Sequence, residues 1–329
     1  MAEAQVRPLA VWRGTEKTHM QPLSELVSVC RLALLALLVA AALCGCSVRQ
    51  FALNRSADAL AATGSSFAAD DDPDLIRDAA PFSLKLMDSV LAETPEHVGL
   101  LTAAARGYTQ YAYAFVQQEG EALEDTDIAR AAARFERARG LYNRGRDYAL
   151  RGLEISHPGF ALAFAKDPRS AVLQATRADV PLLYWGAAAT GAWIGLSKDN
   201  PAAVAQLPLM EALIDRALVL DESWDAGTIH TFLIAYEGVR AQRSGDPVAA
   251  ARKHFERAVA LSHGQQAAPY VAFAESVAVS AQNRAQFEQL LKKALAVDVD
   301  ARPQWRLVNV IMQRRARWLL SRTEQLFAQ

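Results

Sequence analysis

The side chains best suited to binding chemistry are aromatic rings and isolated polar groups that interrupt apolar segments. Aromatic rings can hold the apolar body of a small molecule, and a carboxylate can hold a polar head group or an ion. Glu237 and Glu275 fall at roughly matching positions of two successive helical hairpins. The residues that we expect to line a ligand-binding pore or cleft are Tyr184, Trp185, Trp193, Trp224, His230, Tyr236, Glu237, Tyr270 and Glu275.

Each of these residues also has a purely structural interpretation, which the sequence leaves open. Aromatic residues at helical spacing commonly belong to the core, and a buried glutamate can be paired with an arginine such as Arg314 or Arg315. For His230, a core or capping role is favoured over ligand binding. Arg314, Arg315 and Arg317 form either a docking face for a partner or lipid head groups, or a solvated helix face with intramolecular pairs, which we favour.

The sequence lacks the motifs of the common enzyme classes. It contains no Gly-x-Ser-x-Gly elbow, no His-Glu-x-x-His pair, no Walker loop and no dinucleotide fingerprint. Its six histidines, at positions 19, 97, 157, 230, 254 and 263, include no pair one helical turn apart. The formal net charge of −1 argues against a nucleic-acid partner, which would demand a basic surface. We therefore predict a protein that is not an enzyme and that has no metal site or cofactor.

An uninterrupted apolar run of 12 residues, LALLALLVAAAL, extends from Leu32 to Leu43. It is too short to cross a membrane as a helix and is typical of the core of a signal peptide. Met20 is an alternative start that would give this signal peptide a more ordinary beginning. We expect an N-terminal extension and signal peptide over residues 1–45, a lipidated N-terminus and linker over 46–73, and one folded domain over 74–329.

The apolar run ends in Leu43-Cys44-Gly45-Cys46, which resembles the lipobox of bacterial lipoproteins. The resemblance implies that Cys46 becomes the acylated N-terminus of the mature protein. By the rule for Gram-negative bacteria, Ser47 then implies sorting to the periplasmic side of the outer membrane, with the lipid as the only membrane attachment. All three cysteines lie in or beside this signal, so the folded domain has no thiol or disulfide. The alternative is an ordinary signal peptide with incidental cysteines.

The elements that must position the candidate residues are helices. Apolar residues make up 52% of the chain, Ala-rich helical periodicity dominates, and strand signals are poor, so the sequence predicts an all-α fold. We expect turns at residues 64–66 and 70–72, and the acidic run at 70–72 is more typical of a helix cap than of a calcium loop. Helices are expected over 75–92 and about 126–155. A single amphipathic helix from Pro303 onward would cap the array.

One pattern recurs in the second helix of four hairpins, in which three residues spaced four and then three apart fall on one face. In the hairpin over 227–262, a helix from Thr228 to Gln242 precedes a turn, Asp246 caps the next helix, and Pro247 takes its first position. The middle residues of the four stripes are separated by 79, 41 and 36 residues, against about 34 in a tetratricopeptide array, which predicts an insertion after the first. The stripes are Ala131, Phe135 and Ala138; Met210, Ile214 and Ala217; Ala251, Phe255 and Ala258; and Phe287, Leu291 and Ala294.

Several stretches together resemble the TRAP-transporter T-component (TatT) family. They are GYTQYAYAF, LYWGAAATGAWIGLS, LMEALIDRALVLDESWDAGTIHTFLIAYEG, GDPVAAARKHFERAVALS, FAESVAVSAQNRAQFEQLLKKALAVD and NVIMQRRARWLL. The resemblance implies degenerate tetratricopeptide-like hairpins that form a right-handed superhelix with a central pore or cleft. It also implies a periplasm-facing lipoprotein that forms a homotrimer and associates with the substrate-binding P-component of a TRAP transporter.

Two functions follow from these features. The first is an accessory lipoprotein of a TRAP-type solute uptake system that handles a small apolar or amphipathic ligand. The second is a scaffold lipoprotein whose repeats bind only other proteins, for example in envelope assembly. A pore predicts apolar and aromatic inward faces along a channel, whereas a scaffold predicts an open groove with polar, exposed positions. Tyr184, Trp185, Trp193 and Tyr236 favour the pore.

Overall fold

The computed structural model describes residues 27–28, 31, 49–240 and 245–327, and every regular element in these ranges is helical. The predicted all-α class is therefore confirmed. The chain divides into two compact units, residues 1–52 and 53–329, and every element from α2 onward belongs to the second. Met20, the apolar run over 32–43, Cys46 and Ser47 lie outside the described residues. No helix within the described ranges is long and apolar enough to cross a membrane.

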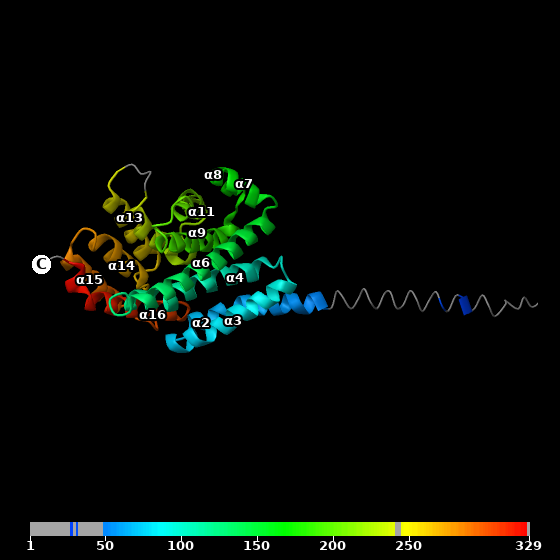
Figure 1. Cartoon of the computed structure of the whole chain (residues 1–329), viewed down its shortest axis with the longest axis horizontal. Coiled ribbons are helices and arrows are strands. Elements are labelled where there is room, and N and C mark those ends of the chain that lie inside the picture. Colours follow the sequence, from blue (N-terminus) through cyan, green and yellow to red (C-terminus); the bar gives the residue numbers. More distant parts are fainter. Residues whose placement is uncertain (1–26, 29–30, 32–48, 241–244, 328–329) are drawn as a thin grey trace, which may run out of the picture. The chain divides into compact units, whose positions relative to one another are not determined.

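The helices of the second unit pack largely against their neighbours in sequence (Figure 1). In chain order they are α2 (Gly64–Ala68), α3 (Pro73–Glu93), α4 (Val98–Tyr111), the π-helix η1 (Ala112–Gln117), α5 (Gln118–Leu123), α6 (Ile128–Ser156), α7 (Phe160–Lys166), α8 (Pro168–Ala171), η2 (Val172–Gln174), η3 (Arg177–Asp179), α9 (Val180–Gly195), α10 (Pro201–Val204), α11 (Leu207–Leu220), η4 (Trp224–Gly227), α12 (Thr228–Glu237), α13 (Pro247–Leu261), α14 (Ala268–Phe273), the π-helix η5 (Ala274–Ala278), α15 (Arg284–Leu295), η6 (Pro303–Trp305), α16 (Arg306–Ser321) and α17 (Thr323–Leu326). The short helices between α6 and α9 fill the predicted insertion.

Two predicted helix caps are confirmed. The Asp72 carboxylate accepts hydrogen bonds from the amides of Asp74 and Leu75 at the start of α3, and Pro73 takes the first helical position. The Asp246 carboxylate accepts a hydrogen bond from the Val248 amide at the start of α13, which begins at Pro247. Each cap satisfies backbone donors that the first helical turn leaves free, so each fixes where its helix begins.

Three predicted boundaries are wrong. Residues 64–66 belong to α2, because the turn comes one residue earlier, where the Thr63 hydroxyl donates back to the Leu60 carbonyl at 2.6 Å. Helix α12 ends at Glu237 instead of Gln242, since Gly238 follows and glycine disfavours a helix interior by about 1 kcal/mol. The single terminal helix is broken at Arg322, between α16 and α17.

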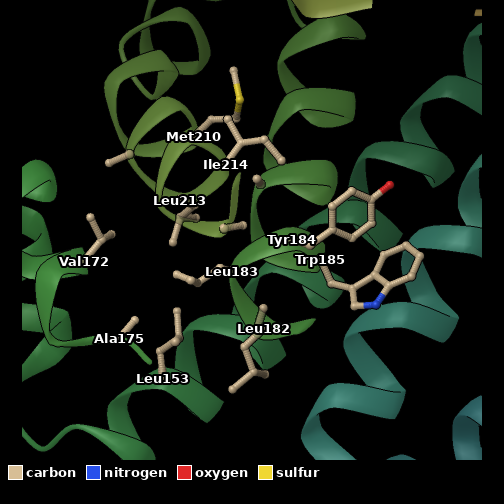
Figure 2. Close-up of a cluster of buried hydrophobic side chains, with 14 of the residues drawn as sticks. Leu153, Val172, Ala175, Leu182, Leu183, Tyr184, Trp185, Met210, Leu213 and Ile214 are labelled. Carbon is tan, nitrogen blue, oxygen red and sulfur yellow. The ribbon is translucent and has the colours of Figure 1, made fainter. Parts of the chain in front are cut away.

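The four predicted stripes face inward. The last residue of each stripe is fully buried, and Phe135 and Phe255 are half-buried. The small residues let paired helices approach closely, as in α9 with α11 and α12 with α13. Figure 2 shows the aliphatic side chains of α9 and α11, such as Leu183 and Leu213, packed together, while Tyr184 and Trp185 extend from the other side of α9.

The last long helix, α16, packs against the first helices of the unit as well as against α14 and α15 (Figure 1). Arg306 donates to the Ala69 carbonyl at 3.0 Å, and Arg314 pairs with Asp74 at 3.2 Å, across 237 and 240 residues of chain. Arg315 also pairs with Glu121. The predicted intramolecular pairing of Arg314 and Arg315 is therefore confirmed, but the predicted solvated face is wrong for Arg315, which is buried against α5 and η5. The helix contacts close into a circuit instead of ending at a cap.

Candidate ligand-binding site

Three of the predicted aromatic residues meet in one cluster, which we call the aromatic cluster. The ring centres of Tyr184 and Trp185 lie 4.9 Å apart, those of Tyr184 and Trp224 lie 4.9 Å apart, and those of the two tryptophans lie 6.5 Å apart. Helix α9 supplies the first two and η4 the third. Tyr184 and Trp185 are buried and Trp224 is half-buried. Burial raises the pKa of the Tyr184 hydroxyl, which therefore stays protonated.

The backbone beside Trp224 is strained. Asp225 has φ 46° and ψ 45°, Ala226 has φ 53° and ψ 38°, and Gly227 follows at φ 91°, so three successive residues adopt left-handed conformations. Residues other than glycine rarely do so, and such strain persists where the surrounding structure enforces it. The Thr228 hydroxyl fixes the turn by donating to the Asp225 carbonyl at 2.8 Å and its carboxylate at 3.1 Å. The turn therefore presents Asp225 directly after Trp224.

Arg106 of α4 lies within electrostatic reach of Asp225, although the two form no ion pair. Burial lowers the pKa of Arg106 and raises the pKa of Asp225, and each charge opposes the shift of the other. Asp225 is nevertheless exposed. Protein atoms surround its carboxylate, which raises the pKa, but water still reaches it. Gly64 leaves room for Arg106, because a Cβ there would lie 1.6 Å from Nη2.

Neither Arg106 nor Asp225 was predicted from the sequence as a site residue. Arg106 is the one charged residue in the segment LLTAAARGY. A single charge among small and apolar residues could have been used to predict it as a site residue. Asp225 gave no signal, because an acidic residue before Ala-Gly is typical of an ordinary turn.

The other predicted residues make their closest contacts elsewhere, although Tyr236 shares an apolar core with Tyr184 and Trp185. Trp193 lies beneath Arg146, whose guanidinium carbon is 5.4 Å from its ring centre. Tyr270 packs against Phe255 at 5.7 Å within the apolar core of α12–α16. The structure thus places both in contacts that stabilise the fold.

His230 belongs to a histidine pair between α12 and α13. Its Nδ1 lies 2.8 Å from Nδ1 of His254, and its Nε2 lies 3.3 Å from Glu222. Burial lowers the pKa of both histidines, that of His254 to about 4. Among the described residues, no group of three or more His, Cys, Asp or Glu side chains could hold a metal ion.

Tyr236 and Glu237, at the end of α12, share the partner Arg240. The Arg240 guanidinium lies 5.1 Å from the ring centre of Tyr236 and pairs with Glu237 at 2.9 Å. The Tyr236 hydroxyl donates to Glu211 at 2.6 Å. Tyr236 is therefore held by α11, and Glu237 by an arginine just beyond its own helix that also pairs with Asp215 of α11.

Glu275 lines a different feature, a cavity of about 560 Å³ beside α16. Arg315 lies there between Glu275 and Glu121, and Trp318 stacks on its guanidinium at 4.2 Å. Burial raises the pKa of Glu121, and Arg315 opposes that shift. Burial alone would lower the pKa of Arg315, but the two carboxylates raise it. We call this group the closing seam, because it joins α16 to α5 and η5.

Comparison with known proteins gives the family. A sequence model described as the TRAP transporter T-component matches residues 69–327. An uncharacterized protein of Treponema pallidum (strain Nichols) is 29% identical over 265 residues, which are 79% of this chain and 82% of that protein. The matched region includes the aromatic cluster and the closing seam. The chain therefore belongs to the TRAP transporter T-component family.

Proposed function

We propose that this protein is a non-catalytic accessory of a TRAP-type uptake system and that it binds a small apolar or amphipathic ligand at the aromatic cluster. The observation that carries the proposal is the meeting of Tyr184, Trp185 and Trp224 from two elements beside the strained turn at Asp225. Rings at this spacing offer an apolar surface, and strained turns concentrate at binding sites. Family membership supplies the link to TRAP transport.

The assembly that we propose is a homotrimer that docks the substrate-binding P-component. A lipid on Cys46 anchors it to the periplasmic side of the outer membrane, and a pore or cleft within each superhelical protomer admits the ligand. Support comes from the lipobox-like sequence at 43–46, from family membership and from the circuit of helices that α16 closes.

Native mass spectrometry tests this function. The full-length protein is purified mildly and mixed with the P-component of the same TRAP system. We expect a trimer that captures the P-component and retains a small-molecule adduct. Trp224→Ala should reduce the retained adduct at least tenfold, because it removes one wall of the aromatic cluster. Trp193→Ala, which removes a tryptophan outside the cluster, should leave it unchanged.

Circular dichroism of both variants controls for folding. A monomer that ignores the P-component and carries no adduct would contradict the proposal and favour a scaffold lipoprotein. If wild type and Trp224→Ala retain the adduct equally, the ligand does not bind at the aromatic cluster.

A further inference from the structure

Two opposite charges beside the aromatic cluster lack charged partners in contact. Arg106 forms no hydrogen bond or ion pair with any residue that the structure describes. Asp225 accepts a hydrogen bond from Thr228 and, within the same described part, forms no ion pair. They influence each other through space without touching. Arg106 is half-buried and protein atoms surround the Asp225 carboxylate, so a charged partner from outside would stabilise both.

The chemistry of the two groups sets what that partner must carry. A guanidinium presents parallel N–H donors that match a carboxylate, and a carboxylate accepts hydrogen bonds from an ammonium group. An anion alone would satisfy Arg106 but would bring a like charge toward Asp225. A cation alone would satisfy Asp225 and face Arg106 in the same way.

The apolar surface lies directly beside the charges. Trp224 precedes Asp225 in sequence, and its ring lies 4.9 Å from that of Tyr184. Asp225 also contributes to the raised pKa of Tyr184, so the carboxylate and that ring are neighbours. A ligand held by both charges would therefore place the remainder of its structure against these two rings.

We propose that the aromatic cluster binds a small zwitterion with an apolar body, such as an α-amino acid with an apolar side chain. Its carboxylate lies on Arg106, its ammonium group on Asp225, and its body against Trp224 and Tyr184. The inference rests on the proposed function, because it names the ligand class of the same site.

Isothermal titration of the full-length protein with matched probes tests the ligand class. The probes are L-phenylalanine and L-leucine, which carry both charges, 3-phenylpropionate, which lacks the ammonium group, and phenethylamine, which lacks the carboxylate. We expect L-phenylalanine to bind at least tenfold more tightly than either single-charge probe. Arg106→Gln and Asp225→Asn should each weaken its binding at least tenfold, and asparagine tolerates the left-handed backbone at position 225.

Two variants control for general charge effects. Arg137→Gln removes an exposed arginine that lies over Tyr111 at 5.8 Å, and Asp199→Asn removes an exposed carboxylate, so neither should change binding. If 3-phenylpropionate or phenethylamine binds as tightly as L-phenylalanine, the site takes an anion or a cation and the zwitterion is overturned. If no probe binds, the zwitterion is also overturned, and adduct retention by Trp224→Ala then decides the proposed function separately.

Discussion

Two arginines of this molecule differ in their partners: Arg315 is buried and paired, whereas Arg106 is half-buried and unpaired within the part of the chain that the structure describes. Arg315 lies between Glu121 and Glu275, and the ring of Trp318 stacks on it. Arg106 has neither a carboxylate nor an aromatic ring in contact among the described residues. Since desolvating an unpaired cation is unfavourable, the helices that Arg315 joins account for Arg315, whereas for Arg106 we propose a ligand as the missing partner.

The same contrast separates two carboxylates, Glu275 and Asp225. Glu275 interrupts an apolar helix and was predicted to bind ligand, yet its carboxylate pairs with Arg315. Asp225 was not predicted as a site residue, yet it is the carboxylate beside the aromatic cluster that forms no ion pair within the described residues. For the proposed site, we therefore use the lack of an internal partner as the criterion, in place of polarity within an apolar segment.

The largest expected effect comes from breaking the closing seam. Arg315→Met leaves Glu121 and Glu275 without their cation, so we expect a loss of about 3–5 kcal/mol in the free energy of unfolding. Equilibrium denaturation in urea measures it. Arg317→Met, on the exposed face of the same helix, should change stability by no more than about 0.5 kcal/mol. A similar loss in both variants would show that α16 tolerates methionine poorly and that the seam contributes little.

In the histidine pair, pH decides whether a buried cation is present, because each imidazole gains a positive charge when it is protonated. Burial lowers the pKa of His254 to about 4, and that of His230 in the same direction, whereas unfolded histidine titrates near 6.5. Between pH 4 and 6.5 the unfolded chain therefore binds more protons, and stability rises with pH, by at most about 1.4 kcal/mol per pH unit for each proton. Glu222 reduces the effect at His230.

Urea denaturation from pH 4.5 to 7.5 measures this dependence. His254→Phe should flatten the slope, whereas His263→Asn should leave it unchanged, because His263 lies outside the pair and asparagine tolerates its left-handed backbone. A slope that is the same in wild type and His254→Phe would show that other groups, such as the carboxylates, set the pH dependence.

The sequence predicted what depends on local pattern. The inward stripes ending at Ala138, Ala217, Ala258 and Ala294 follow from helical periodicity, and the caps at Asp72 and Asp246 from residue type beside proline. The circuit that α16 closes could not be predicted this way, because it joins residues up to 240 positions apart.

In the candidate site too, contacts between residues close in sequence could be predicted, and contacts between distant residues could not. Tyr184 and Trp185 are adjacent in sequence, so their proximity could be predicted. The approach of Trp224 to Tyr184 depends on a turn with two non-glycine residues at positive φ. No propensity predicts such a turn, because it is imposed by packing. Arg106 reaches the site from α4, nearly 120 residues earlier in the chain, and only the fold brings it there.

The smallest expected effect has the opposite sign and tests the comparison most directly. If Arg106 is kept for a ligand, Arg106→Met removes an unpaired charge and should raise the unfolding free energy of the ligand-free protein by about 1 kcal/mol. Arg106→Lys keeps the charge and should give no such gain. Both are measured by urea denaturation after the ligand is removed by dialysis. A loss comparable to that of Arg315→Met would mean that Arg106 has a structural partner, and the distinction between the two arginines would no longer hold.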